Sequence, residues 1–445
     1  APERARCRAY AESFFGWPDV VRRHVSVYRQ AMHPAAPKPR VVFLDHCAQL
    51  SGGELALLRL LPALDEIEAH VILAEDGPLV SRLLEAGISV EVLPLDTEAQ
   101  RLGRHRARPG GVPARALVAS GAHVLRLARR LRRLRPDIVH TNSLKATVYG
   151  GFAARLAGVP VIFHIRDRIA DDYLPASTAR ALRLFARHVP AAVIANSATT
   201  LATLGRPRLG WTVIPSPIGV SLNGAEPRGR SGTQPRLRSG TQPSLRSGTQ
   251  PRWRSGTQPL RIGIVGRLAP WKGQHVFLEA FARAFPSGGA DAVIVGSALF
   301  GEDDYARRLE SDAAELGLDA RVEFRGFRED IEHELSRLDV LVHASTVAEP
   351  FGQVVVEGMA VGLPVVASGA GGPAEVVEDG VTGLLYPPSD VAALAARLER
   401  LAGDPALRQA LGDAARRRAR DFQPDRVAPQ VMAVYRRVAI RSSHT

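Results

Sequence analysis

Residues 349–357 read Glu-Pro-Phe-Gly-Gln-Val-Val-Val-Glu, and residues 340–344, just before them, read Val-Leu-Val-His-Ala. The short apolar run predicts a buried strand, since a strand covered on both faces shows no polar alternation. Pro350 followed by a second apolar run predicts that a helix begins there. A buried strand that leads into a helix is the repeating unit of a doubly wound parallel sheet. Such sheets bind ligands at the carboxyl ends of their strands, where this junction lies.

Two carboxylates, Glu349 and Glu357, lie eight positions apart at this junction. A carboxylate there can accept hydrogen bonds from ligand hydroxyls, while free amides at the helix start face an anion. Sugar hydroxyls beside a phosphate fit that arrangement. Taken singly, Glu349 is more simply interpreted as a loop carboxylate and Glu357 as a solvated helix residue.

The rest of the chain alternates short β-rich runs with helical runs, which indicates an α/β protein with parallel sheets. A length of 445 residues is enough for two domains. We expect an N-terminal extension over residues 1–39, a first domain over 40–220, a linker over 221–259 and a second domain over 260–423. The expected strands are residues 41–44, 70–73, 90–93, 137–140, 161–164, 192–195 and 212–214, then the run that opens at Leu260, and 292–295, 322–324, 340–342 and 364–367.

The linker contains a short repeat, Arg-Ser-Gly-Thr-Gln-Pro, which starts at residues 230, 238, 246 and 254. Its glycine, proline and polar residues leave little to bury, so a disordered linker is predicted. An arginine-rich tether to an acidic partner is the alternative.

The net charge of +13 lies mainly in the two appendages. Residues 1–39 carry seven basic and three acidic side chains, and residues 228–259 carry seven arginines and no acid. The two domains are therefore close to balanced, and no nucleic-acid partner is expected.

One basic cluster lies inside the first domain, where residues 101–135 hold eleven arginines and no acid. Leucines at 125, 127, 131 and 134 form an apolar stripe at helical spacing among these arginines. The pattern fits an ordinary packed helix with a solvated face. It also fits attraction to an anionic membrane surface or an anionic acceptor.

Only Cys7 and Cys47 are present, so no disulfide framework is implied and a reducing cytoplasm is the simplest location. No apolar run approaches the roughly 18 residues that span a bilayer. We expect a cytoplasmic protein, peripheral on the inner face of the membrane if the arginine cluster binds lipid.

The stretch from Glu349 to Glu357 resembles the Glu-x7-Glu signature of glycosyltransferase family 4. Gly266-Arg-Leu-Ala-Pro-Trp-Lys-Gly273 resembles the diphosphate-binding segment of that family, and residues 365–377 and 380–385 resemble the turns that follow the signature. The resemblance implies a GT-B fold, in which two Rossmann-like doubly wound parallel-sheet domains enclose an interdomain cleft. It also implies that the first domain binds the acceptor, that the second binds the nucleotide sugar, and that a helix over residues 424–445 crosses back onto the first domain.

The resemblance assigns roles to individual residues. Catalytic roles fall on Glu349, Lys272, Arg267 and His164. Donor-binding roles fall on Glu357, Gly52, Gly53, Phe351, Gly352, Gln353, Arg325, Gly326 and Phe327. The two cations suit a departing diphosphate, because arginine grips phosphate oxygens bidentately and lysine acts as a point charge.

The function implied is retaining transfer of a sugar from a UDP- or GDP-linked donor to a glycan, lipid or small-molecule acceptor. No Asp-x-Asp motif occurs in the sequence, so we expect no metal and no cofactor. A sugar-nucleotide epimerase of similar architecture and a non-catalytic binding protein for nucleotide sugars are the alternatives. The long repeat linker departs from the short hinge of the family.

Overall fold

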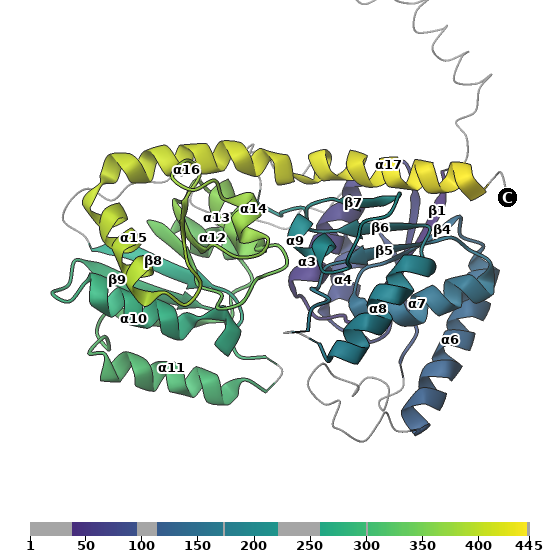
Figure 1. Ribbon diagram of the computed structural model, residues 1–445, viewed down its shortest axis with the longest axis horizontal. Helices are drawn as coiled ribbons and strands as arrows, with labels where there is room; N and C mark the ends of the chain where they lie inside the picture. The colour runs from purple at the N-terminus through teal and green to yellow at the C-terminus, as the bar shows by residue number, and fades with distance from the viewer. Residues whose placement is uncertain (1–37, 96–113, 172–173, 221–258, 300, 443–445) are drawn as a thin grey trace, which may run out of the picture.

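The structure is a computed structural model that describes residues 38–95, 114–171, 174–220, 259–299 and 301–442. Residues 1–37 of the expected N-terminal extension and residues 221–258 of the expected linker lie outside the described residues. The described parts form two α/β domains joined along one side by a long C-terminal helix (Figure 1).

The first domain is built on a sheet of seven parallel strands in the order β3-β2-β1-β4-β5-β6-β7. The central strands are almost entirely buried, because helices cover both faces of the sheet. In chain order the strands are β1 (Arg40–Asp45), β2 (Glu68–Leu73), β3 (Ser89–Val92), β4 (Ile138–Thr141), β5 (Val161–Ile165), β6 (Ala192–Ala195) and β7 (Trp211–Val213). The helices are α3 (Gly52–Leu60), η1 (Leu61–Ala63), α4 (Pro78–Glu85), α6 (Ala114–Leu134), α7 (Leu144–Ala157), α8 (Ala176–His188) and α9 (Ala198–Ala202).

The second domain has six parallel strands in the order β10-β9-β8-β11-β12-β13. The strands are β8 (Leu260–Val265), β9 (Ala290–Val295), β10 (Val322–Gly326), β11 (Val340–His343), β12 (Val365–Ser368) and β13 (Leu384–Tyr386). The helices are η2 (Pro270–Lys272), α10 (Gln274–Ala284), α11 (Asp303–Glu315), α12 (Ile331–Ser336), α13 (Gln353–Ala360), α14 (Pro373–Val376), α15 (Val391–Gly403), α16 (Pro405–Ala419), η3 (Arg420–Phe422) and α17 (Pro424–Ser442).

The predicted fold class, two doubly wound parallel-sheet domains, is confirmed. Every predicted strand is present, with ends that differ by no more than two residues. The strand missed in the sequence, β13, is three residues long and too short to show a pattern. In each sheet the strand order reverses once, between β1 and β4 and between β8 and β11. These reversals are the points at which doubly wound sheets bind ligands.

Helix α17 leaves the second domain and lies along the first, as Figure 1 shows at the top of the molecule. Its apolar side chains belong to the core that contains β1 and α3: Val431, Val434 and Tyr435 are almost fully buried beside Phe43 and Leu57. The first domain is therefore completed by the last helix of the chain. Within the described residues, no helix is long and apolar enough to cross a membrane.

Because α16 packs closely against α13 and the turn after it, we expect one methyl group added to α16 to lower the stability of the protein. A Cβ on Gly412 would lie 2.2 Å from the carbonyl oxygen of Gly362, a backbone atom with little freedom to move. We expect Gly412→Ala to lower the free energy of unfolding by roughly 1–3 kcal/mol in urea titrations. The matched control is Gly121→Ala in α6, where a Cβ meets nothing within 4 Å. That variant should be neutral or up to roughly 1 kcal/mol more stable. Equal stability of the two variants would contradict this packing argument.

Candidate active site

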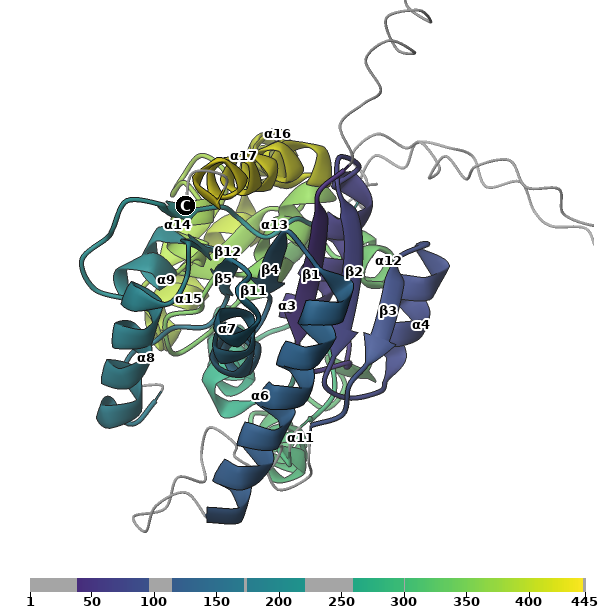
Figure 2. The same ribbon diagram turned by 90° about the vertical axis from the view of Figure 1, so that its right-hand side faces the viewer.

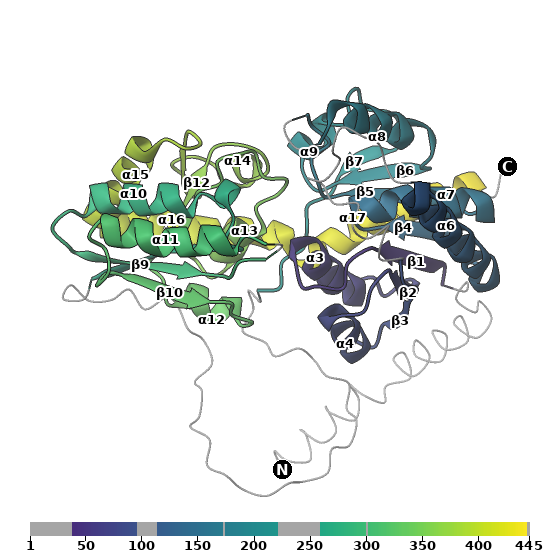
Figure 3. The same ribbon diagram turned by 90° about the horizontal axis from the view of Figure 1, so that it is seen from below.

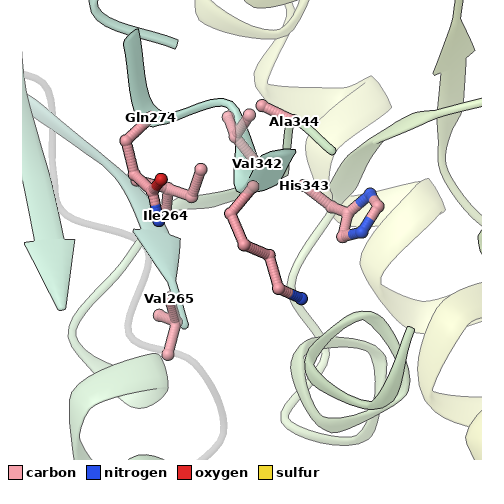
Figure 4. A pocket seen from close by; sticks show the side chains of 7 residues that line it. Ile264, Val265, Gln274, Val342, His343 and Ala344 are labelled. Atoms are coloured by element: carbon pink, nitrogen blue, oxygen red, sulfur yellow. The ribbon is translucent and has the colours of Figure 1, made fainter. Parts of the chain in front are cut away.

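A small pocket lies at the reversal point of the second sheet, between the ends of β8 and β11 (Figure 4). Its lining comes from three segments. Strand β8 contributes Ile264 and Val265, and the end of β11 contributes Val342, His343 and Ala344. Lys272 of η2 and Gln274 at the start of α10 complete the lining. The sequence placed Lys272 after the first strand of this domain and the Glu349 segment after β11. The structure brings these two segments together.

Lys272 and Glu349 form a largely buried ion pair beside this pocket. The Lys272 ammonium donates to both carboxylate oxygens of Glu349 at 2.8 Å. On the other side, Ser345 Oγ donates to Glu349 Oε2 at 2.8 Å, and His343 Nε2 lies 2.7 Å from the same oxygen. The carboxylate is therefore held from two sides, and its position is fixed before any ligand binds.

The charge state of Glu349 follows from this surrounding. Burial alone would raise the pKa of the Glu349 carboxyl, but Lys272 and His343 hold it well below its ordinary value. The group is ionised throughout the physiological range. An ionised carboxylate accepts hydrogen bonds only, so it is suited to receive hydroxyl donors.

The turn that carries Lys272 depends on a close backbone approach. Gly273 has φ of 72°, and a Cβ there would lie 1.9 Å from the carbonyl oxygen of Ala344. Only glycine fits this contact, which holds η2 against the end of β11. Trp271 on the same turn packs under both cations, with the Arg267 guanidinium 5.7 Å and the Lys272 ammonium 4.5 Å from its ring centroid.

Glu357, the second of the two glutamates, faces the first domain. Glu357 Oε1 pairs with Arg59 of α3 at 2.7 Å, and both side chains are largely buried. The side-chain nitrogen of Gln353 donates to the Gly52 carbonyl oxygen at 2.7 Å, and its side-chain oxygen accepts from Arg59. Figure 3 shows α3 and α13 meeting at the boundary between the domains. Burial raises the pKa of Glu357, and Arg59 opposes that shift.

The helix start between the two glutamates is tightly built. Gly352 has φ of 84°, and a Cβ there would lie 2.7 Å from a ring carbon of Pro373. Phe351 is buried against Phe422, with ring centroids 5.8 Å apart. These contacts fix the loop from Glu349 to Gln353, on which the expected donor contacts depend.

A second contact across the domain boundary involves Glu375. Its carboxylate accepts from the backbone amides of Ala198 and Thr199 at 2.7 and 2.6 Å. These amides open α9 of the first domain, and an anion at a helix start is favoured by the free N–H groups and the helix dipole. Within the first domain, Ser197 caps the same helix by accepting a hydrogen bond from the Thr200 amide at 3.0 Å.

On the first-domain side, the expected residues lie at the reversal point of the first sheet. Gly52 and Gly53 open α3, and the Gly53 carbonyl oxygen accepts from Asn142 at 3.1 Å. His164 lies on β5 and is 1% exposed, beside Arg166. Arg166 donates to Asn142 Oδ1 at 2.8 Å, so these groups form one network.

Three expected donor-binding residues form a separate group at the end of β10. Arg325 is paired with Glu334 at 2.6 Å and also with Glu323. Gly326 has φ of 64°, and Phe327 after it is 57% exposed. The salt bridges hold the turn in place, and the exposed ring is the group available for stacking.

Sequence reasoning missed several residues of the site, among them His343 and Arg59. His343 lies inside the apolar run of β11, and its spacing from Glu349 carries no recognisable signal. Arg59 lies on an ordinary helix of the other domain, so only the arrangement of the domains reveals its partner. Among the residues described, no cluster of three or more His, Cys, Asp or Glu side chains could hold a metal ion.

Comparison with known proteins gives the family. Residues 249–418 match the model described as "Glycosyl transferases group 1", and residues 78–222 match "Glycosyltransferase Family 4". A GDP-mannose-dependent alpha-mannosyltransferase of Mycobacterium tuberculosis is 30% identical over 315 residues, which cover 67% of this chain and 74% of that protein. The chain belongs to the GT4-type glycosyltransferases.

Other relatives of this glycosyltransferase match over shorter stretches. An exopolysaccharide phosphotransferase of Streptomyces coelicolor is 34% identical over 165 residues, which cover 37% of this chain but 17% of that protein. Six further curated relatives are covered over half of their length or less. The crystal structure of Anabaena Alr3699/HepE in complex with UDP and glucose has a TM-score of 0.72 and 28% identity. The match covers 89% of this chain and 98% of the Anabaena chain. The enzyme therefore has a GT-B fold.

The buried ion pair predicts a non-additive pair of mutations. Lys272→Met leaves Glu349 buried without its ammonium partner, and we expect the free energy of unfolding at pH 7 to fall by about 3–5 kcal/mol. Adding Glu349→Gln removes the unpaired charge and should recover part of that loss. Because the folded pKa of Glu349 lies below its ordinary value of 4.5, the stabilisation is present above pH 4.5 and lost as pH falls through the folded value.

Urea unfolding of the single and double variants measures this coupling. The control is Lys38→Met, at an exposed position, which should change stability by less than about 0.5 kcal/mol. Strictly additive effects of the Lys272 and Glu349 substitutions would contradict the coupling.

Proposed function

We propose that this glycosyltransferase moves a sugar from a nucleoside-diphosphate sugar to a hydroxyl acceptor with retention of anomeric configuration and without a metal ion. The observation that carries the proposal is the Lys272–Glu349 pair beside the pocket at the end of β8 and β11. It sets a cation for a diphosphate next to a carboxylate for sugar hydroxyls, at the edge where parallel sheets bind ligands.

Each side chain has a separate task in this proposal. Glu357, kept near Arg59, accepts hydrogen bonds from the ribose hydroxyls of the nucleotide. Arg267 and Lys272 stabilise negative charge on the departing diphosphate, and Glu349 holds hydroxyls of the donor sugar. Amides around Phe351, Gly352 and Gln353 assist at the start of α13. The acceptor approaches from the first domain, near Gly53 and His164.

Retention follows from displacement on a single face of the sugar. The bond between the anomeric carbon and the phosphate oxygen breaks, and the acceptor oxygen bonds to the same face. The proton of the acceptor hydroxyl passes to an oxygen of the leaving phosphate, which acts as the base. No protein nucleophile is needed, and the diphosphate leaves with the charge that Arg267 and Lys272 stabilise.

Relatives support a donor linked to uridine or guanosine. The Anabaena structure contains UDP and glucose, and the Mycobacterium tuberculosis relative is described as GDP-mannose-dependent. Phe327 and the salt-bridged Arg325 turn lie at the end of β10, where we place contacts with the base. The donor base is therefore the first property to measure.

Thermal unfolding with UDP, GDP and ADP tests this function. A nucleotide at 100 times its dissociation constant adds roughly 2.7 kcal/mol to the stability of the folded enzyme. We expect one of the three nucleotides to raise the midpoint clearly, and we expect Glu357→Gln to remove most of that rise. Glu399→Gln, an exposed substitution on α15 of the same domain, should respond as the wild type does. No response of the wild type to any nucleotide would contradict the proposal.

A membrane-bound acceptor is favoured by the surface of α6 and α7, which lie side by side in Figure 2. Of the predicted leucine stripe on α6, Leu127 and Leu131 are buried, whereas Leu125 is 49% exposed. Arg129 and Arg133 are exposed on this helix.

The neighbouring helix α7 adds apolar surface to these arginines. Val148, Phe152 and Leu156, spaced four residues apart, are 37%, 51% and 48% exposed. Arg132 of α6 donates to the Leu156 carbonyl oxygen, which joins the two helices at this surface. Exposed apolar side chains beside arginines suit the boundary of an anionic bilayer. We therefore propose that this surface contacts the membrane.

Sedimentation with vesicles of phosphatidylglycerol and phosphatidylcholine tests the membrane contact. Each arginine near an anionic surface contributes about 1 kcal/mol, so replacing Arg129 and Arg133 with glutamine should weaken binding roughly 30-fold. The control replaces Arg307 and Arg308, exposed arginines of α11 in the second domain, and should bind as the wild type does. Equal binding of both double variants would contradict this contact.

A further inference from the structure

A chain of buried side chains connects the C-terminal helix to His164. Tyr435 of α17 places its hydroxyl 2.8 Å from Nδ1 of His140 on β4. Nε2 of the same His140 ring lies 3.1 Å from Nδ1 of His164 on β5. All three side chains are 0% to 1% exposed, and each contacts the next directly. The three residues are separated in sequence and meet only because α17 returns to the first domain.

Arg166 determines which ring nitrogens of His164 and His140 carry a proton. One of its guanidinium nitrogens lies 3.4 Å from His164 Nδ1. A guanidinium has N–H donors and no acceptor, so His164 Nδ1 must accept and carries no proton. Arg166 is itself held by Asn142 and Ser216 at 2.8 Å each, which fixes its direction.

The remaining protons follow from that assignment. His140 Nε2 faces an acceptor, so it carries the proton and donates to His164. A neutral imidazole has one N–H, which leaves His140 Nδ1 as the acceptor of the Tyr435 hydroxyl proton. Burial and the charge of Arg166 lower the pKa of His140 to about 3 and hold that of His164 well below its ordinary value, so both rings are neutral.

These assignments leave His164 Nε2 at the end of this series of side chains. His164 Nε2 must carry the ring proton, yet it is buried and has no hydrogen-bond partner among the residues that the structure describes. A buried N–H without a partner is costly and rare in native proteins. A ligand that supplies an oxygen atom would satisfy it.

We propose that Tyr435 and His140 are positioning residues that, together with Arg166, hold His164 in the Nε2–H form, so that its ring donates a hydrogen bond to an oxygen of the bound nucleotide sugar. The identity of that ligand rests on the proposed function, whereas the proton arrangement belongs to the free protein. With Nδ1 occupied by Arg166 and His140 and Nε2 already protonated, His164 cannot take the acceptor proton. That exclusion agrees with a leaving phosphate as base.

The proton arrangement can be measured without substrate. Long-range nitrogen–proton correlation spectra of protein labelled with nitrogen-15 in histidine distinguish the two neutral forms of each ring. His164→Asn identifies the His164 signals by their loss. We expect both His140 and His164 to be in the Nε2–H form in the nucleotide-free enzyme. An Nδ1–H form of His164 would overturn the proposal.

A single hydroxyl group tests the role of Tyr435. Tyr435→Phe keeps the buried ring and removes only the O–H that donates to His140 Nδ1. His140 then loses the donor that keeps its own proton on Nε2, and its ring should shift to a mixture of the two forms. Hydrolysis of UDP-glucose or GDP-mannose, according to the nucleotide that stabilises the enzyme, should slow roughly three- to tenfold in kcat. The loss should fall on kcat rather than on nucleotide affinity, since the hydroxyl is far along the chain from the ligand.

Tyr386→Phe is the matched control, because Tyr386 of β13 is a buried tyrosine whose hydroxyl has no partner among the described residues. It should leave the histidine spectra and kcat unchanged. Unchanged spectra and kcat in Tyr435→Phe, with thermal unfolding like that of the wild type, would overturn the role of Tyr435. If the wild type bound no nucleotide, the proposed function would fail, and the spectra would still decide the proton arrangement.

Discussion

The ion pair between Lys272 and Glu349 is the interaction on which the candidate site depends. It brings the turn after β8 and the loop after β11 together across the point where the strand order reverses. The pair is possible because Gly273 allows the turn to touch the end of β11 without a side chain between them. A sugar nucleotide would thus meet charges whose positions are set in advance, which is how enzymes limit the cost of reorganisation.

The two sheets contribute in different ways. The second sheet offers fixed charges, Lys272, Glu349 and Glu357, beside a glycine-dependent turn and a helix start. The first sheet offers a buried hydrogen-bonded network that reaches from Asn142 to Tyr435 on α17. Because α17 is part of the core of the first domain but follows directly from the second, the geometry of that network is tied to how the domains are joined. Arg59, in the last turn of α3, and Glu357 of the second domain add a charged contact between the domains.

The sequence was sufficient for the fold and for part of the geometry of the candidate site. Short apolar runs that alternate with helical runs predicted the parallel sheets, since strands covered on both faces show no polar alternation. The position of Lys272 and Glu349 after two strands predicted that they share one edge. The pairing of Glu357 with Arg59 and the relay through His140 could not be predicted, because both depend on contacts between segments separated by hundreds of residues. Nothing in the local pattern around Tyr435 distinguishes it from an ordinary core residue.

The bond from Glu375 to the start of α9 has a consequence for motion. The two amides that donate hydrogen bonds to Glu375 belong to the other domain, and they lose this partner whenever the domains move apart. Exchange of the Ala198 and Thr199 amide hydrogens with deuterated solvent would then proceed only during such separations. These two backbone positions would therefore record how often the enzyme opens, even with no substrate, dye or engineered probe attached.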